Sequence, residues 1–409
     1  MPSETFSFPG HSGHTLAARL ERPAGPALAA ALFAHCFTCS KDLAAARRLT
    51  RRLAAEGYAV LSFDFTGLGA SEGEFAATTF ASNAADLVAA AEAMAARDLA
   101  PGLLIGHSLG GAAAIRAAAE MPSVKAVAVI GAPFDPGHVT RHFEDALGRI
   151  ARDGAAEVDL GGRPVRIGQG FVEDVAHGDL GPDLRALKAA LLVLHAPRDE
   201  IVGIDNATRI FTAARHPKSF VSLDGADHLL SRTADAEHAA EVIGAWAARH
   251  VGLRRPAPPP GVPEGITRVS EADPAGFLQD IVSGPHHILA DEPAAYGGSN
   301  RGLTPYGLLA AALGACTTMT LRMYARRKSW PLAHVSVDVT HAKVHARDCE
   351  DCGTGGGAGA RIDRFNCVIR VEGDLTPEQR AGLLDVAGRC PVHRTLKATA
   401  EIATELAAD

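Results

Sequence analysis

The stretch that most constrains the fold of this 409-residue chain is residues 103–111, where a short apolar run ends in Gly-His-Ser-Leu-Gly. An Ala-rich helical pattern follows at once, which predicts a strand, a sharp turn and a helix, with Ser108 on the turn. Leu109 begins that helix, so its backbone amide is expected to face an oxyanion formed at Ser108. The pattern favours a nucleophilic serine over the alternative, a tight glycine turn with an idle serine.

Around this stretch, apolar runs alternate with helical patterns over residues 1–251. The expected strands are 5–8, 15–21, 29–35, 58–64, 102–106, 124–131, 190–196 and 218–223, and the expected helices include 41–56, 78–97 and 234–250. This alternation predicts the α/β class, with a mostly parallel sheet and helices on both faces. Residues 136–187 interrupt it with an expected hairpin at 158–167, and we interpret them as a small cap over the site.

A proline-rich segment, residues 252–265, follows this part of the chain. It contains five prolines and little that can pack, which is typical of a semi-rigid linker. We therefore expect two domains, residues 1–251 and 266–409.

Composition and charge narrow the function classes. A formal net charge of −7 argues against a nucleic-acid partner. The N-terminus shows no secretory signal and the seven cysteines are an odd number, so we expect a cytoplasmic protein whose cysteines serve redox chemistry, metal binding or core packing. The uncharged run 302–321 is long enough to span a bilayer, but its proline, glycines and threonines favour a buried helix over a membrane span.

A serine nucleophile needs a histidine base, and the histidine needs a carboxylate to orient it. In this topology the expected order is serine, acid, histidine. Asp199 follows one apolar strand and His228 follows the next, at the sheet edge where catalytic groups collect. We therefore predict a Ser108–Asp199–His228 triad. The alternatives are that Asp135 is the acid, that Asp199 caps a helix, or that His228 is a surface loop residue.

The loop after the third strand, residues 35–40, is expected to supply the second oxyanion donor. The Phe37 amide is the favoured donor, with that of Cys36 next. Cys36 and Cys39 form a C-x-x-C pair. We interpret them as small residues that shape the pocket, and a redox or metal role stays open.

These features together resemble the α/β-hydrolase family over nearly all of residues 1–250. The resemblance is carried by Gly-His-Ser-Leu-Gly at 106–110, Phe-Asp-Phe-Thr-Gly-Leu-Gly-Ala-Ser at 63–71, Asp199 and His228. It implies acyl transfer to water through an acyl-enzyme on Ser108, with no cofactor. Esters, amides and thioesters all remain possible substrates.

Two cysteines stand out in the second domain. Cys316 lies in an apolar helical pattern at 308–326, which we expect to be buried. Cys390 precedes Pro391, which favours the first position of a helix, so Cys390 is expected at a helix N-terminus with arginines nearby. These surroundings favour a thiolate. Composition alone leaves open a redox pair or two buried thiols.

The motifs around these cysteines resemble the OsmC and organic hydroperoxide resistance family over about residues 266–409. They are His-Ile-Leu-Ala-Asp-Glu-Pro at 287–293, Gly-Gly at 297–298, Thr-Pro-Tyr-Gly-Leu-Leu-Ala-Ala-Ala-Leu-Gly-Ala-Cys at 304–316 and Cys-Pro-Val-His at 390–393. The resemblance implies an α+β fold and an intertwined homodimer. Carried over, Cys316 is the peroxidatic thiolate, Cys390 is the resolving thiol, and a dithiol reduces the resulting disulfide.

The chain differs from the hydroperoxide-resistance branch of this family in the residues that activate the first cysteine. A glutamate stands there ten residues before the cysteine, and this chain has Tyr306. Arg268 and Arg322 are the candidates for the activating arginine.

A zinc site can also be drawn from side chains with H-x3-H-x3-C-x2-C spacing: His341, His345, Cys349 and Cys352. Because a glycine-rich stretch follows at 353–359, we interpret this segment as a solvated loop and predict no metal.

The sequence as a whole predicts an acyl hydrolase fused to a thiol-peroxidase-like domain. The expected partners are a small acyl ester, an organic hydroperoxide and a dithiol reductant. The alternative is that the second domain only pairs two hydrolases as a dimerisation module with idle thiols.

Overall fold

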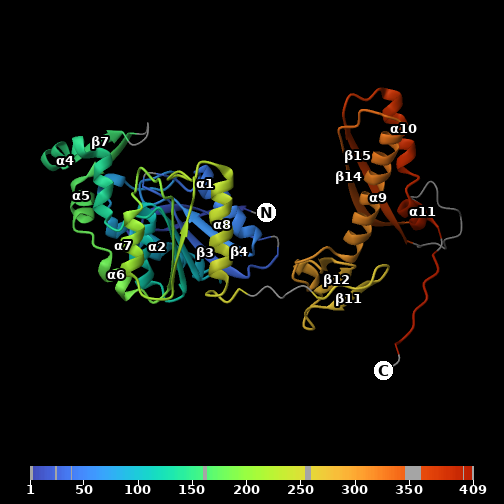
Figure 1. The fold of residues 1–409 in the computed structure, drawn as a ribbon, viewed down its shortest axis with the longest axis horizontal. Coiled ribbons are helices and arrows are strands. Elements are labelled where there is room, and N and C mark those ends of the chain that lie inside the picture. Colours follow the sequence, from blue (N-terminus) through green and yellow to red (C-terminus); the bar gives the residue numbers. More distant parts are fainter. Residues whose placement is uncertain are drawn as a thin grey trace. The chain divides into compact units, whose positions relative to one another are not determined.

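The computed structural model describes residues 3–23, 25–37, 39–159, 164–253, 259–345, 361–398 and 400–407. The chain forms two compact units, Met1–Ala257 and Pro258–Asp409. Each unit has its own strands and helices, labelled in Figure 1.

The first unit is built on a sheet that has eight strands among the described residues. In spatial order they are β1 (Ser3–Pro9), β2 (Thr15–Glu21), β4 (Tyr58–Phe63), β3 (Ala29–Ala34), β5 (Leu103–His107), β6 (Ala126–Ile130), β9 (Ala190–His195) and β10 (Lys218–Ser222). β2 pairs antiparallel with β1 and with β4, and the remaining neighbours are parallel. The mostly parallel sheet expected from the sequence is therefore confirmed.

Helices cover both faces of this sheet, as the sequence predicts. They are α1 (Ala44–Ala55), α2 (Phe80–Ala95), α3 (Leu109–Ala117), α7 (Asp205–Ala213) and α8 (Thr233–Ala248), with short 3₁₀ turns η1 (Phe75–Ala77) and η2 (Ala118–Glu120). α1 lies beside α8 in one apolar core, and α2 and α3 share the other (Figure 1). The central strands are buried on both sides, which explains their continuous apolar runs.

The segment that interrupts the alternation lies between β6 and β9. It consists of η3 (Pro136–Ala146), α4 (Leu147–Asp153), β7 (Ala155–Asp159), β8 (Pro164–Gly168), α5 (Gln169–Ala176) and α6 (Gly181–Ala186). β7 and β8 form the expected antiparallel hairpin, although its turn lies outside the described residues. Phe143 and Phe171 are buried in this segment and stack on Phe37 of the loop after β3, so the cap-like segment packs on that loop.

The second unit combines three strands, a long helix and a separate hairpin. Its elements are β11 (Thr267–Glu271), β12 (Gln279–Ser283), β13 (His286–Ala290), η4 (Ala294–Tyr296), α9 (Pro305–Arg327), β14 (His334–His345), β15 (Arg361–Glu372), α10 (Pro377–Ala387) and α11 (Pro391–Lys397). β14, α10 and α11 all pack against α9. This arrangement is the α+β fold that the OsmC resemblance implies.

The expectation that the helix carrying Cys316 is buried is wrong for the single chain. Only 28% of the most apolar window of α9 is buried, and Met319 and Met323 are 65% and 70% exposed. Among the helices in the described part of the chain, α9 is also the one whose length and composition would permit it to cross a membrane. Within the described residues of the second unit, an apolar face of α9 is therefore left exposed.

Candidate functional site

Ser108 lies at the sharp turn between β5 and α3. Its backbone has φ 55° and ψ −128°, a conformation that residues other than glycine rarely adopt. This conformation raises the serine above the end of the strand. A Cβ on Gly106 would meet the Gly110 carbonyl oxygen at 2.4 Å, and one on Gly110 would meet the His35 carbonyl oxygen at 2.3 Å. The motif glycines are therefore required because the helix packs directly on the strand ends.

The structure brings the three predicted triad residues together from three different strand ends. His228 Nε2 lies 3.0 Å from Ser108 Oγ, and His228 Nδ1 lies 2.7 Å from Asp199 Oδ2. The other Asp199 oxygen accepts hydrogen bonds from the backbone amides of Ile201 and Val202, both at 2.9 Å. One imidazole therefore connects the hydroxyl to a carboxylate that the backbone holds in place.

The surroundings of Asp199 keep it ionised. Burial by itself raises the pKa of Asp199, but hydrogen bonds from His228 and from the amides of Val202 and Ile201 outweigh that effect and lower it. An ionised Asp199 accepts the Nδ1 proton of His228, which leaves Nε2 free to accept the proton of the Ser108 hydroxyl.

The rival interpretations do not match these contacts. Asp135 is the N-cap residue of η3, where its side chain accepts the Gly137 amide hydrogen at 2.9 Å. Asp199 does not cap α7, whose N-cap residue is Ile204. His228 has an 8% exposed side chain, unlike a surface loop histidine.

A cavity of about 660 Å³ opens in front of this triad. The residues along its wall include Ser108, His228, Leu109, Phe37, His138 and His142. Both amides expected to bind an oxyanion, those of Phe37 and Leu109, belong to residues of this wall. The cavity is therefore large enough for an acyl substrate whose carbonyl carbon lies beside Ser108.

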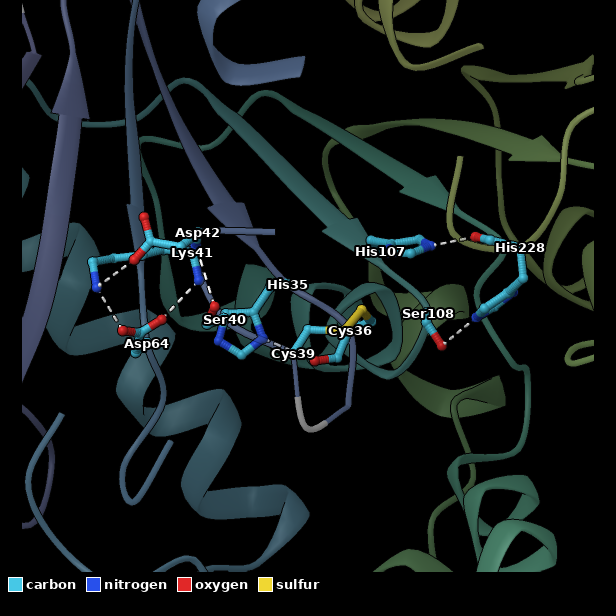
Figure 2. Close-up of a disulfide and its surroundings, with 10 residues drawn as sticks. All are labelled: His35, Cys36, Cys39, Ser40, Lys41, Asp42, Asp64, His107, Ser108 and His228. Carbon is cyan, nitrogen blue, oxygen red and sulfur yellow. Dashed lines mark hydrogen bonds and ion pairs between the residues drawn. A yellow bond between two sulfur atoms is a disulfide. The ribbon is translucent and has the colours of Figure 1, made fainter. Parts of the chain in front are cut away.

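Cys36 and Cys39 also line this cavity, and the structure joins them by a disulfide (Figure 2). The favoured interpretation, small residues that shape the pocket, did not include this bond. Their Cα atoms lie 5.3 Å apart because the chain turns between them, with the Cys39 amide donating to the Cys36 carbonyl oxygen at 3.1 Å. The C-x-x-C spacing was the only signal for this bond in the sequence.

Sequence reasoning missed the role of His107, the residue before the nucleophile. Its ring is buried and its Nε2–H donates to the His228 carbonyl oxygen at 2.7 Å, which ties the base loop to β5 (Figure 2). Burial, followed by the nearby His228, lowers the pKa of His107 to about 4. His107 therefore stays neutral and keeps this hydrogen bond down to mildly acidic pH.

The low pKa of His107 predicts an acid-sensitive first unit. In the unfolded chain the His107 side chain is protonated below about pH 6.5, whereas in the folded chain its pKa is about 4. The free energy of unfolding therefore falls as the pH drops from about 6.5 to about 4. Between pH 7 and pH 5 we expect this residue to contribute a loss of about 2 kcal/mol. Urea unfolding of the wild type and of His107→Gln, followed by Trp246 fluorescence in a Trp330→Phe background, measures this contribution. Equal losses in the two proteins would contradict it.

In the second unit, Cys390 is the N-cap residue of α11, as the following proline predicts. Its side chain is fully buried, and its sulfur accepts the His393 amide hydrogen at 3.3 Å. The same sulfur lies 3.6 Å from Thr317 Oγ1, and Thr317 directly follows Cys316 on α9. Cys316 is half-buried and both thiols are free. The structure therefore places the Cys390 sulfur against the helical turn that carries Cys316.

The two arginines that were candidates for activating Cys316 have other surroundings. Arg268 lies on β11, where every residue is exposed. The Arg322 guanidinium donates to the Leu332 and Ala333 carbonyl oxygens after α9. Tyr306, at the position of the family glutamate, stacks on the His341 ring with centroids 4.2 Å apart.

The zinc alternative gains no support from the part of the chain that the structure describes. His341 Nε2–H donates to Asp363 at 2.8 Å, and His341 is therefore already paired. Cys349, Cys352 and the His345 side chain lie outside the described residues. Among the residues that are described, no group of three or more histidine, cysteine or acidic side chains is arranged to hold a metal ion.

Two parts of the chain match known protein families. Residues 30–160 match the family described as serine aminopeptidase S33, and residues 297–405 match the OsmC-like protein family. Among solved structures, the esterase domain of a Rhodothermus marinus protein is 51% identical over 62% of this chain and 100% of that one, with a TM-score of 0.52. No match was found among curated proteins.

More distant structures share the fold of the first unit. The α/β hydrolase GrgF from Penicillium sp. sh18 is 19% identical over 62% of this chain and 100% of that one, with a TM-score of 0.53. Alpha/beta hydrolase domain-containing protein 10 from mouse is 21% identical over 60% of this chain and 99% of that one, with a TM-score of 0.50. With the match to the whole length of the Rhodothermus marinus domain and the OsmC match over residues 297–405, the chain belongs to the α/β-hydrolase family and fuses such a domain to an OsmC-like domain.

Proposed function

We propose that the first unit is a serine hydrolase that cleaves carboxylic esters. The observation that carries this proposal is the unbroken hydrogen-bond chain from Asp199 through His228 to Ser108, with distances of 2.7 and 3.0 Å. The esterase domain that is 51% identical supports an ester over an amide substrate.

In the proposed reaction, Ser108 Oγ attacks the ester carbonyl carbon while His228 Nε2 takes the hydroxyl proton. The carbonyl oxygen becomes an oxyanion that accepts hydrogen bonds from the Phe37 and Leu109 amides. His228 then gives its proton to the leaving alcohol. A water molecule, deprotonated by the same imidazole, hydrolyses the acyl-enzyme and restores Ser108.

The walls of the cavity indicate the kind of acyl group. Phe37, Val139, Val202 and Leu229 offer apolar surface, and the cavity volume of about 660 Å³ exceeds what an acetyl group fills. Burial of the His142 ring, followed by the charge of the nearby His138, lowers the pKa of His142 below its usual value. The His142 ring is therefore neutral at pH 7. An acyl chain longer than acetyl that carries no negative charge matches this wall best, because the wall also contains Asp42 and Asp159.

A covalent probe tests the nucleophile directly. A fluorophosphonate should form one phosphonyl adduct per chain, because only an activated serine attacks it. Intact mass spectrometry counts the adduct and peptide mapping should place it on Ser108. Pre-incubation with a p-nitrophenyl ester of intermediate chain length should slow the labelling. A chain that stays unlabelled, or carries the adduct on another residue, would overturn the proposal.

For the second unit we propose reduction of organic hydroperoxides by Cys316 and Cys390. The Cys316 thiolate attacks the terminal peroxide oxygen, which releases an alcohol after protonation and leaves a sulfenic acid. The Cys390 thiol then displaces water from that sulfenic acid and forms a disulfide, which an external dithiol reduces. The match to the OsmC-like family and the contact of Cys390 with Thr317 support this assignment.

A second role for this unit follows from its exposed helix face. Leu309, Met319 and Met323 of α9 are 43%, 65% and 70% exposed, although an apolar surface of this kind is normally covered. We propose that α9 packs against the second unit of another chain in a homodimer, as the OsmC resemblance implies. This role is independent of whether the thiols react.

The dimer has a direct test. Replacing Met319 and Met323 with glutamate places charges on the exposed face, so we expect the molar mass from light scattering to fall to that of one chain, 42.4 kDa. The matched control is Glu378→Gln with Asp385→Asn on α10, which also changes two side chains and should stay dimeric. Wild-type protein that elutes as a monomer at micromolar concentration would contradict the assignment.

A further inference from the structure

We propose that Cys36 and Cys39 form a redox-active thiol–disulfide exchange site in the wall of the acyl cavity, through which small thiols and dithiols set the rate of ester hydrolysis. The proposal rests on the function proposed for Ser108. It concerns a separate chemistry, because no atom of the disulfide takes part in acyl transfer.

The disulfide lies beside the catalytic groups. Cys36 and Cys39 line the same cavity as Ser108 and His228, and Figure 2 shows the bond on the loop that faces this pair. Phe37, whose amide is the proposed oxyanion donor, lies inside the ring that the disulfide closes. Breaking or forming this one bond therefore acts directly on a group that stabilises the transition state.

The disulfide adds little to the overall stability of the unit. Its two cysteines are three residues apart, and the stabilisation by a cross-link decreases as the closed loop becomes shorter. Both ends of the loop are already held without it. His35 Nδ1–H donates to the Cys36 carbonyl oxygen at 2.8 Å, and Lys41 donates from its amide and its Nζ to the buried Asp64 at 2.7 and 2.6 Å. The bond therefore fixes the conformation of the turn between these anchors.

One of the two sulfur atoms is accessible to a small thiol. Cys36 is 4% exposed, whereas Cys39 is half-buried and also lines a second cavity of about 470 Å³ beside Gly67 and Glu74. A small thiol can therefore approach Cys39 from a cavity other than the acyl site. Cys39 is the sulfur that we assign as the point of attack, and Cys36 is the leaving group.

Thiol–disulfide exchange at this site takes two steps. The thiolate of an external dithiol attacks Cys39 Sγ, the bond between the two cysteine sulfurs breaks, and Cys36 leaves as a thiolate that takes a proton from water. The second sulfur of the dithiol then attacks the mixed disulfide and releases Cys39. The protein gains two electrons and two protons, and the dithiol is oxidised to a cyclic disulfide. An external disulfide reverses both steps.

Reduction changes the turn because two unbonded sulfur atoms cannot stay as close as two bonded ones. Because His35 holds the Cys36 side of the turn, the movement falls on the Cys39 side. The Phe37 ring remains stacked on Phe171 and Phe75, with centroids 5.3 and 5.7 Å away. The oxyanion donor is therefore displaced but not removed, and the rate should fall by less than the roughly 100-fold or greater loss that follows when such a donor is deleted.

The experiment uses the full chain with only this pair left to react. Its five other cysteines are replaced by serine: Cys316→Ser, Cys349→Ser, Cys352→Ser, Cys367→Ser and Cys390→Ser. Hydrolysis of a p-nitrophenyl ester is measured for the oxidised protein, after reduction with dithiothreitol, and after re-oxidation with oxidised dithiothreitol. A thiol titration in parallel counts free sulfhydryl groups. The matched variant carries Cys36→Ser and Cys39→Ser in the same background.

We expect two thiols to appear on reduction, with a roughly tenfold fall in kcat, a small change in KM and full recovery on re-oxidation, because an oxyanion donor acts on the transition state alone. The Cys36→Ser/Cys39→Ser variant should show the reduced rate under all conditions. Two outcomes overturn the proposal: a bond that native protein does not release to dithiothreitol, or a reduced form whose kcat stays within twofold of the oxidised form. Both differ from failure of the proposed esterase, in which the oxidised protein itself is inactive and carries no fluorophosphonate on Ser108.

Discussion

Replacing Ser108 with alanine is expected to lower kcat for a p-nitrophenyl ester by about 10⁶-fold, the scale on which a serine hydrolase loses activity without its nucleophile. The physical reason is that the hydrogen-bond chain from Asp199 through His228 has no hydroxyl to activate. Removing the base with His228→Ala should cost a similar factor. Combining the two changes should cost no more than either alone, since the residues act as one unit.

Stopped or continuous assays with p-nitrophenyl esters of increasing chain length measure this effect. Ser231→Ala, at an exposed serine near the base loop, is the control and should hydrolyse at the wild-type rate. Circular dichroism of each variant excludes unfolding as the cause of a loss. An alanine variant at position 108 that keeps more than a tenth of the activity would show that another nucleophile does the work.

The second large effect is expected in the other unit. Cys316→Ser should abolish the dithiol-dependent reduction of an organic hydroperoxide while leaving ester hydrolysis unchanged, because the two reactions use different units. Cys390→Ser should stop turnover at a different stage. Its first peroxide molecule is still reduced, and a sulfenic acid then accumulates on Cys316 that a dimedone probe can trap.

Cys367→Ser provides a matched cysteine control. Burial, followed by the nearby Cys390, raises the pKa of the Cys367 thiol, so this group is a poor nucleophile and its loss should not change peroxide turnover. Loss of two thiols per wild-type chain on adding the hydroperoxide is the expected titration. Wild-type protein whose thiols survive the peroxide would favour the alternative, a dimerisation module with idle cysteines.

Much of the first unit could be anticipated because its signals are local. The apolar run before Ser108 and the alanine-rich pattern after it predict the strand and the helix, and the small size of Gly106 and Gly110 predicts their close approach. Asp199 and His228 are distant in sequence. They could be assigned because each follows a parallel strand, and parallel strands end at one edge of the sheet.

Other features depend on contacts that sequence spacing does not encode. A C-x-x-C pair predicts a metal ligand set, a redox pair or two small residues equally well, and only the turn of the chain brings Cys36 and Cys39 within bonding distance. The exposure of Met319 and Met323 was missed because an apolar helix pattern shows what must be covered but does not show which chain covers it. His107 was missed because its partner is a carbonyl oxygen, and backbone groups leave no trace in a sequence.

The stacking of Phe37 on Phe171 and Phe143 has a consequence for engineering the selectivity of this protein. The Phe37 ring lies on the loop whose amide is proposed to bind the oxyanion. It is held by η3 and α5, the helices that would be redesigned to admit bulkier or shorter alkyl groups. Libraries built in α5 or η3 will therefore alter turnover number and chain-length preference together. Screening such libraries for binding alone would enrich variants with high substrate affinity and a low turnover number.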